Sequence, residues 1–182
     1  MSRIAIPARD EAPACSESMP DAIEKQFGFV PNLFSIMSLS PSALMGWVGL
    51  QGALAKTLDI KTREGIALAV SQVNSCQYSL SAHTFTAKNI TKLCAEEILR
   101  NRHATSSDLK TEAALKFAKK AVETRGHVTE ADLVAVQEAG YDEENIVEII
   151  ALSTQFLLTN FLTNVFDTPI DFPVVSLDPI SA

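Results

Sequence analysis

Apolar residues recur every three or four positions along most of this chain, which is the period of an α-helix. The longest such stretch follows Asp142 and continues to about Phe166. A second amphipathic stretch runs from Asp108 to Glu123, and Thr129 starts a short one with the spacing of a capping box. Asp and Thr side chains accept hydrogen bonds from the first N–H groups of a helix, so these residues mark predicted helix starts.

Shorter helices are predicted in the first half of the chain. Asp59 and Thr91 are predicted caps, and Pro41 stands at a first helical position, where its missing N–H needs no partner. These signals predict helices over about residues 18–28, 31–37, 40–58, 59–73, 76–88 and 91–100. No segment alternates convincingly with a period of two, so the predicted fold is an all-α helical bundle.

The 182 residues fit one domain, flanked by two segments without helical periodicity. Residues 1–17 contain two prolines and are predicted to form an N-terminal arm. The helical domain is predicted at residues 18–168. Pro169 and Pro173 end regular structure, which leaves residues 169–182 as an extended C-terminal tail.

Composition excludes some classes of partner. The chain is 47% hydrophobic and 20% charged, which is sufficient for a core. Its net charge of −7 provides no basic surface for a phosphate backbone or an anionic membrane, so we expect neither nucleic acid nor a membrane as a partner. The apolar stretch after Ile146 contains Glu148, Gln155 and Asn160, each costly in hydrocarbon, and is therefore predicted to be a buried helix.

The cysteines indicate a reducing compartment. Cys15, Cys76 and Cys94 are too few, and odd in number, for a secreted disulfide framework. The first residues do not resemble a secretory signal, so we expect free thiols and a cytoplasmic location. Cys94 is expected to pack and Cys15 to lie in the arm, while His103 and His127 are expected at the surface.

One stretch brings together side chains that can carry chemistry. At about 100° per residue, Cys76, Ser79 and His83 fall within about 60° of one another on a single helix. Cys76 is predicted in the first turn, where unpaired N–H groups and the helix dipole stabilise a thiolate. His83 can relay a proton, and Glu64 can orient the imidazole if the preceding helix folds back. Tyr78 can donate a hydrogen bond into the same pocket, although a packing role is about as plausible.

Each of these residues also has an ordinary interpretation. A single buried cysteine usually behaves as a small hydrophobic residue, and a single His or Glu on a helix is usually structural or solvated. The apolar stripe of the last helix fits a core or a subunit interface. The spacing of the four positions is therefore more informative than any one of them.

That spacing resembles the alkylhydroperoxidase D core of the carboxymuconolactone decarboxylase family. The family signature is a Glu, eleven residues, Cys-x-x-Cys, three residues and His, and its four positions are occupied by Glu64, Cys76, Ser79 and His83. Flanking residues also match, and the likeness extends over about residues 20–166, most closely to a peroxidase-related branch.

The resemblance implies an all-α fold of two similar halves, assembled as a homo-oligomer, a trimer or hexamer, through long helices like the last one. It also implies a thiol-dependent hydroperoxide reductase or an oxidoreductase adaptor, with a thiol protein as reductant. In dithiol members the second cysteine attacks the peroxide, Glu and His relay its proton, and the first cysteine resolves the product as a disulfide. Decarboxylases of the family act on small organic acids without the cysteine pair. We expect no cofactor and no metal.

This chain departs from the signature at Ser79, because a serine hydroxyl cannot reduce a peroxide or form a disulfide. Our leading hypothesis is a one-cysteine antioxidant peroxidase in which Cys76 forms a sulfenic acid, rescued by Cys94 or by another thiol. Other possibilities remain open: acid–base chemistry by Glu64 and His83 in a cofactor-free lyase, a non-catalytic oligomer that binds a small molecule or a protein, or a catalytic cysteine replaced by engineering.

Overall fold

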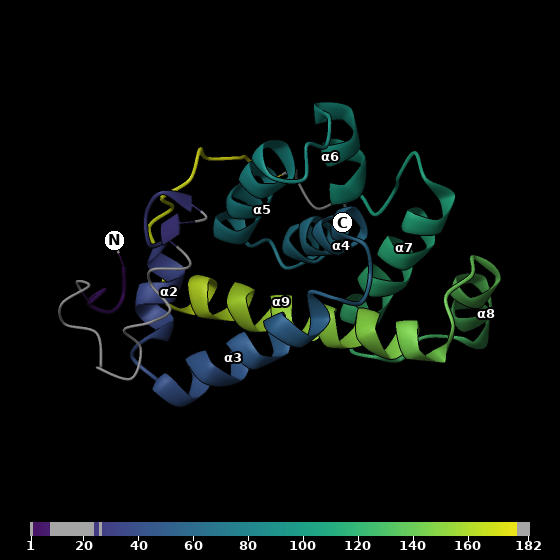
Figure 1. Ribbon diagram of the computed structural model, residues 1–182, viewed down its shortest axis with the longest axis horizontal. Helices are drawn as coiled ribbons and strands as arrows, with labels where there is room; N and C mark the ends of the chain where they lie inside the picture. Colours follow the sequence, from purple (N-terminus) through teal and green to yellow (C-terminus); the bar gives the residue numbers. More distant parts are fainter. Residues whose placement is uncertain (1, 8–23, 26, 178–182) are drawn as a thin grey trace.

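The computed structural model describes residues 2–7, 24–25 and 27–177. Within these residues it contains α-helices and no strand, which confirms the predicted all-α fold (Figure 1). The helices are α2 (Asn32–Met37), α3 (Pro41–Leu54), α4 (Ile60–Val73), α5 (Gln77–Asn89), α6 (Ala95–Arg102), α7 (Leu109–Glu123), α8 (Glu130–Glu138) and α9 (Glu143–Val165).

Most helices begin where a polar side chain caps them. Asp59, Asp108 and Asp142 each accept a hydrogen bond from a backbone N–H in the first turn of α4, α7 and α9. Thr129 and Asp132 exchange both hydrogen bonds of a capping box at the start of α8. These four predicted starts are confirmed, because local capping chemistry alone determines them.

Two predicted helix limits were wrong. Thr91 does not cap a helix, because its hydroxyl donates to the carbonyl of Ala87, 2.8 Å away at the end of α5. Cys94 is the N-cap residue of α6 and is exposed, so the expectation that it packs was also wrong. Helix α3 ends at Leu54 and does not reach Leu58.

Helix α9 is the central element of the fold. It contacts α2, α3, α4, α5 and α7, and Figure 1 shows it extending along the molecule between α3 and α4. Among the described helices, α9 is long and apolar enough to cross a membrane, but half of its apolar window is buried inside the protein. Ile149 and the polar residues Gln155 and Asn160 are all buried, which fits the prediction of a buried core helix.

The main core lies between α4, α7 and α9. Ile66, Leu115 and Ile149 are completely buried there. Gly65 permits the close approach of α4, since a Cβ atom at this position would lie 3.0 Å from Asn101 Oδ1 and 3.0 Å from Leu115 Cδ1. The close packing fixes the position of α4, which carries part of the candidate site.

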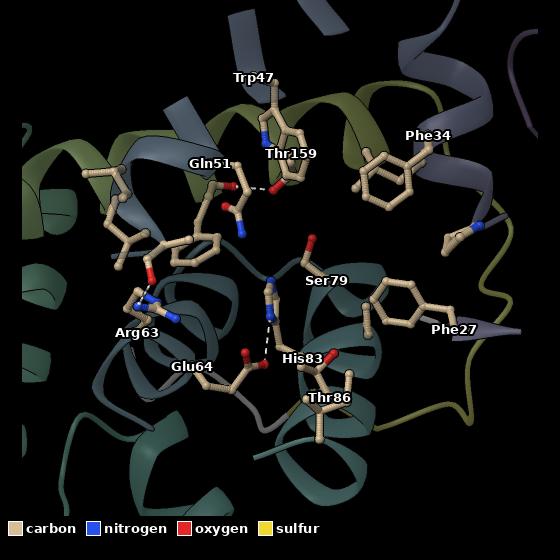
Figure 2. A pocket seen from close by; sticks show the side chains of 18 of the residues that line it. Phe27, Phe34, Trp47, Gln51, Arg63, Glu64, Ser79, His83, Thr86 and Thr159 are labelled. Carbon is tan, nitrogen blue, oxygen red and sulfur yellow. Dashed lines mark hydrogen bonds and ion pairs between the residues drawn. The ribbon is translucent and has the colours of Figure 1, made fainter. Parts of the chain in front are cut away.

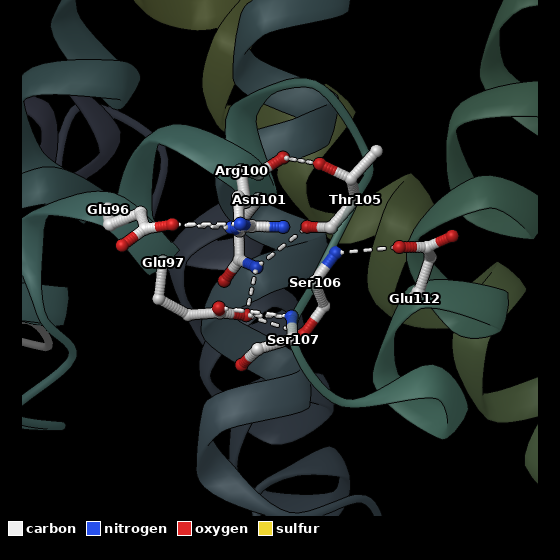
Figure 3. Close-up of polar contacts among 8 residues, drawn as sticks. All are labelled: Glu96, Glu97, Arg100, Asn101, Thr105, Ser106, Ser107 and Glu112. Atoms are coloured by element: carbon white, nitrogen blue, oxygen red, sulfur yellow. Dashed lines mark hydrogen bonds and ion pairs between the residues drawn. The ribbon is translucent and has the colours of Figure 1, made fainter.

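The loop between α6 and α7 is held by a carboxylate (Figure 3). Glu97 accepts hydrogen bonds from the side chains of Asn101 and Ser106 and from the backbone N–H of Ser107. Desolvation raises the pKa of Glu97, but these hydrogen bonds together outweigh it and hold the pKa below its usual value. Glu112 Oε2 accepts from the Ser106 N–H at 3.0 Å, so the loop is tied to both helices.

The C-terminal tail crosses α5. Residues 169–177 contain neither helix nor strand, and Phe172 packs into an aromatic cluster. Val175 accepts a hydrogen bond from Gln77 Nε2 at 3.2 Å and donates its N–H to Ser81 Oγ at 3.0 Å. Most of the predicted arm at residues 1–17, and most of the helix predicted at 18–28, lie outside the described residues.

Candidate active site

Helices α4 and α5 form a hairpin that brings distant parts of the motif together. Ser75, in the turn between them, has a φ of +50°, and the chain reverses direction there. Glu64 on α4 consequently meets His83 on α5, with Glu64 Oε1 2.8 Å from His83 Nδ1. Their side chains are 10% and 23% exposed, respectively. The folding back of α4 and this carboxylate–imidazole contact are as predicted.

The contact determines which nitrogen of His83 is available. An Nδ1–H that donates to Glu64 leaves the other ring nitrogen, Nε2, with its lone pair free to accept a proton. The His83 ring also packs edge-to-face on Phe156 of α9, with centroids 5.1 Å apart. Carboxylate and aromatic ring together restrict the imidazole to one orientation, as a general base requires.

A cavity of about 440 Å³ lies over this pair, between α3 and the α4–α5 hairpin (Figure 2). Ser79 and His83 both line it, and Phe27, Phe34 and Phe172 contribute aromatic surface to its wall. A mostly apolar cavity of this size with a few polar groups is typical of a site for a small molecule.

Cys76 is placed differently from Ser79. It is the N-cap residue of α5, and its sulfur accepts a hydrogen bond from the Ser79 N–H at 3.4 Å, so its predicted place at the helix N-terminus is confirmed. Its Sγ also lies 3.1 Å from Thr163 Oγ1 of α9. However, Cys76 is 0% exposed and is absent from the described residues that line the cavity. The thiol therefore does not line the cavity that the imidazole lines.

Tyr78 has a structural role. Its ring lines the cavity, but its hydroxyl accepts from the Leu33 N–H at 3.1 Å and bonds to Asp171 of the tail. Burial and the nearby Asp171 carboxylate raise the pKa of Tyr78 far above its usual value, so the phenol stays protonated. The Tyr78 hydroxyl thus has partners within the protein, in the Leu33 N–H and the nearby Asp171 carboxylate, which favours the packing role over donation into the pocket.

The other cysteine and histidine residues that the structure describes, Cys94, His103 and His127, do not line the cavity. His103 and His127 are exposed, as predicted. Cys94 and Cys76 are both free thiols, and Cys15 falls outside the described residues. Over the described part of the chain, no group of three or more His, Cys, Asp or Glu side chains is arranged to hold a metal ion.

Sequence reasoning missed the contribution of α3. Trp47, Val48 and Gln51 line the cavity opposite His83, on a helix that no motif marks. The only local signal is composition: α3 is apolar or small at nearly every position and contains a single Gln. We call α3 the roof of the cavity, and α4 with α5 its floor.

The described residues have an alkylhydroperoxidase D-like helical fold, with a carboxylate–imidazole pair over a cavity. Residues 41–120 match the model of the carboxymuconolactone decarboxylase family. No curated protein has a significant match to the chain.

Solved structures extend the likeness in fold to more than nine tenths of the chain. An uncharacterised peroxidase-related protein from Ralstonia eutropha JMP134, an alkylhydroperoxidase D core, is 27% identical over 93% of this chain and 92% of its own, with a TM-score of 0.82. A second peroxidase-related protein, from Silicibacter sp. TM1040, is 22% identical over 92% and 91%, with a TM-score of 0.79. A variant of the debrominase Bmp8, in complex with 2,3,4-tribromopyrrole, has the same fold at 22% identity over 94% of both chains, with a TM-score of 0.76.

Proposed function

We propose that this protein is a cofactor-free enzyme in which His83, oriented by Glu64, transfers a proton to and from a small, largely apolar substrate. The observation that carries the proposal is the 2.8 Å contact between Glu64 and His83 in the wall of a cavity of about 440 Å³. A histidine held in this way is a general base at neutral pH. The proposal follows the acid–base alternative, because the serine and not the thiol reaches the cavity.

The cavity suits a proton transfer that needs no external reagent. Its mostly apolar wall lowers the local dielectric constant, which strengthens electrostatic interactions with a carbanion-like intermediate. Ser79 supplies a neutral hydroxyl beside the imidazole, able to donate to a substrate oxygen. The proposed reaction class is isomerisation or decarboxylation of a compound with an acidic C–H or a labile carboxylate.

The test is an activity panel in D₂O, followed by proton NMR, with cyclic ketones, unsaturated lactones and β-keto acids. We expect wild-type protein and Cys76→Ser to convert or deuterate the same compound at equal rates. His83→Ala should be slower by about 10²–10⁴-fold. The proposal fails if His83→Ala equals wild type, or if Cys76→Ser abolishes turnover.

A thiol peroxidase is the second candidate. It is favoured by the two polar contacts of the Cys76 sulfur, with the Ser79 N–H and Thr163 Oγ1, which suit a thiolate. Its difficulty is access, since a peroxide and a reducing thiol protein must both reach a sulfur that is 0% exposed. Two measurements test this candidate: the consumption of cumene hydroperoxide in the presence of dithiothreitol, and the trapping of a sulfenic acid. Loss of peroxide that Cys76→Ala eliminates would establish this candidate.

We further propose that the protein is a homo-oligomer that assembles through α9. Its exposed face carries an apolar stripe at helical spacing, formed by Val147, Ile150, Leu158, Phe161 and Val165. Apolar rows of this kind on a helix surface mark a contact with another helix. Light scattering should give a multiple of the 19.7 kDa chain mass, reduced by Phe161→Asp. A wild-type monomer at micromolar concentration would contradict this assembly.

A further inference from the structure

We propose that Gln51 is a further catalytic residue: its side-chain NH₂ donates a hydrogen bond to a carbonyl oxygen of the substrate while His83 removes a proton from the adjacent carbon. Gln155 is the positioning residue that turns the Gln51 amide toward the cavity. The inference rests on the proposed function and names its substrate class, a small carbonyl compound with an acidic C–H.

The orientation of Gln51 follows from a chain of hydrogen bonds. The backbone oxygen of Trp47 can only accept, and its contact of 3.5 Å with Gln155 Nε2 favours the NH₂ group at this end of the Gln155 amide, whose Oε1 is buried without a partner. The same NH₂ donates to Gln51 Oε1 at 2.8 Å. Because Gln51 Oε1 is occupied, the free end of its amide is the NH₂ donor.

This series of hydrogen bonds is anchored in the interior through Gln155. Gln155 is only 2% exposed, in the core helix α9, so its amide cannot turn to solvent. Gln51 is an exposed residue that lines the cavity, and its Nε2 makes no hydrogen bond to a described residue. Figure 2 shows the Gln51 amide above the imidazole of His83, on the opposite side of the ring from Glu64.

The facing groups have complementary roles. The imidazole nitrogen that does not bond to Glu64 is a proton acceptor, whereas the Gln51 NH₂ is a donor that keeps its proton at every accessible pH. The Ser79 hydroxyl points into the same space (Figure 2). A substrate that satisfies all of them has a C–H directed at His83 and an oxygen lone pair directed at Gln51, which is the arrangement of a ketone, aldehyde, ester or lactone.

The step is balanced without any further reagent. His83 takes the proton, the C–H electron pair forms a carbon–carbon double bond, and the carbonyl π pair moves onto the oxygen as an enolate. The hydrogen bond from Gln51 strengthens as this negative charge develops. His83 then returns the proton to the same carbon or to a conjugated one. No electrons are gained or lost overall.

The test uses cyclohex-3-enone in D₂O, in which both α-deuteration and migration of the double bond can be followed by NMR. Gln51→Leu removes the donor at similar size, and kcat should fall by about 10²–10³-fold with KM changed less than about threefold. Gln155→Leu should also lower kcat more than it changes KM, but by a smaller factor. Leu50→Ala, an exposed neighbour on α3, is the matched control and should equal wild type.

The outcomes separate the two proposals. Wild-type turnover that His83→Ala abolishes and Gln51→Leu leaves unchanged would overturn the role of Gln51 while the acid–base function stands. A parallel rise in KM without loss of kcat would also overturn it, since that pattern reports binding alone. If wild-type protein neither exchanges nor isomerises the ketone, while it decarboxylates a β-keto acid, the proposed substrate class, a carbonyl compound that loses a proton from carbon, is wrong. Inactivity on the whole panel defeats both.

Discussion

Helices α3 and α4 are both 14 residues long and both face the same cavity, but they are held very differently. Nine residues of α4 are buried, and the helix packs against α5, α6, α7 and α9. Only two residues of α3, Leu44 and Leu54, are buried, and its main contacts are with α2 and α9. The floor of the site is thus part of the core, whereas the roof rests on it.

The difference assigns separate tasks to the two sides. A general base must hold its geometry within about half an ångström, and α4 and α5 provide that rigidity for Glu64 and His83. Helix α3 contains Gly46, Gly49 and Gly52, each worth about 1 kcal/mol less helix stability than Ala. The roof is therefore held less firmly than the floor.

The largest contrast is expected in catalysis. Glu64→Gln on the floor removes the charge that orients His83 and stabilises the imidazolium, so kcat should fall by about 10²–10⁴-fold. Val48→Ala on the roof also changes the cavity wall but should change kcat by less than about tenfold. Steady-state kinetics on the same substrate compare the two variants. Equal losses would mean that roof and floor are equally important for the chemistry.

Core packing gives the next largest contrast. Leu68 of α4 is 0% exposed, so Leu68→Ala leaves a cavity and should lower the free energy of unfolding by about 2–5 kcal/mol. Leu50 of α3 is 38% exposed, and Leu50→Ala should change it by about 0.5 kcal/mol or less. Urea denaturation measures both. A large loss at Leu50 would show that the roof is covered in solution, as an oligomer would cover it.

Glycine substitutions should have opposite signs on the two helices. A Cβ at Gly49 meets nothing within 4 Å, so Gly49→Ala should stabilise the protein by about 1 kcal/mol through helix propensity. At Gly65 the same gain is opposed by contacts of 3.0 Å with Asn101 and Leu115, and overpacking of this kind costs about 1–3 kcal/mol. Thermal unfolding of the pair should therefore show a rise for Gly49→Ala and a fall for Gly65→Ala. Stabilisation by both would refute the close packing of α4.

The smallest effect is expected for the loop between α6 and α7. The pKa of Glu97 is lowered in the folded state, so its contribution is present above the usual value of 4.5 and is lost as the pH falls through the lower folded value. Allowing for solvent screening, Glu97→Gln should cost about 1 kcal/mol at pH 7 and less at pH 3. Glu96→Gln, which breaks an exposed pair with Arg100, should cost less at either pH. Urea titrations at the two pH values provide the comparison.

Sequence patterns predicted what local chemistry determines. The starts of α4, α7, α8 and α9 follow from capping side chains, and the meeting of Glu64 with His83 follows from motif spacing and one reversed turn. Thr91 failed as a cap because its hydroxyl had an alternative acceptor one turn back, in Ala87. Capping residues and residues that bond back to a helix are the same types, so sequence alone does not separate them.

The burial of Cys76 and the role of the roof depended on long-range packing. Thr163, which contacts the Cys76 sulfur, lies 87 positions away on α9. The direction of the Gln51 amide is decided by Gln155, 104 positions away. No periodicity or motif in the sequence connects such residues. The sequence alone therefore could not decide whether the Cys76 thiol is reactive or packed in the core.

The contribution of the tail has a consequence for biosynthesis. Phe172 completes the aromatic wall of the cavity, yet it follows the end of α5 by roughly 80 residues, on the order of 10 s of translation. During that interval a nascent chain already carries Glu64 and His83 but has no closed compartment around them. The complete cavity is therefore not available to a ligand during that interval, and the first-made helices rely on their own packing.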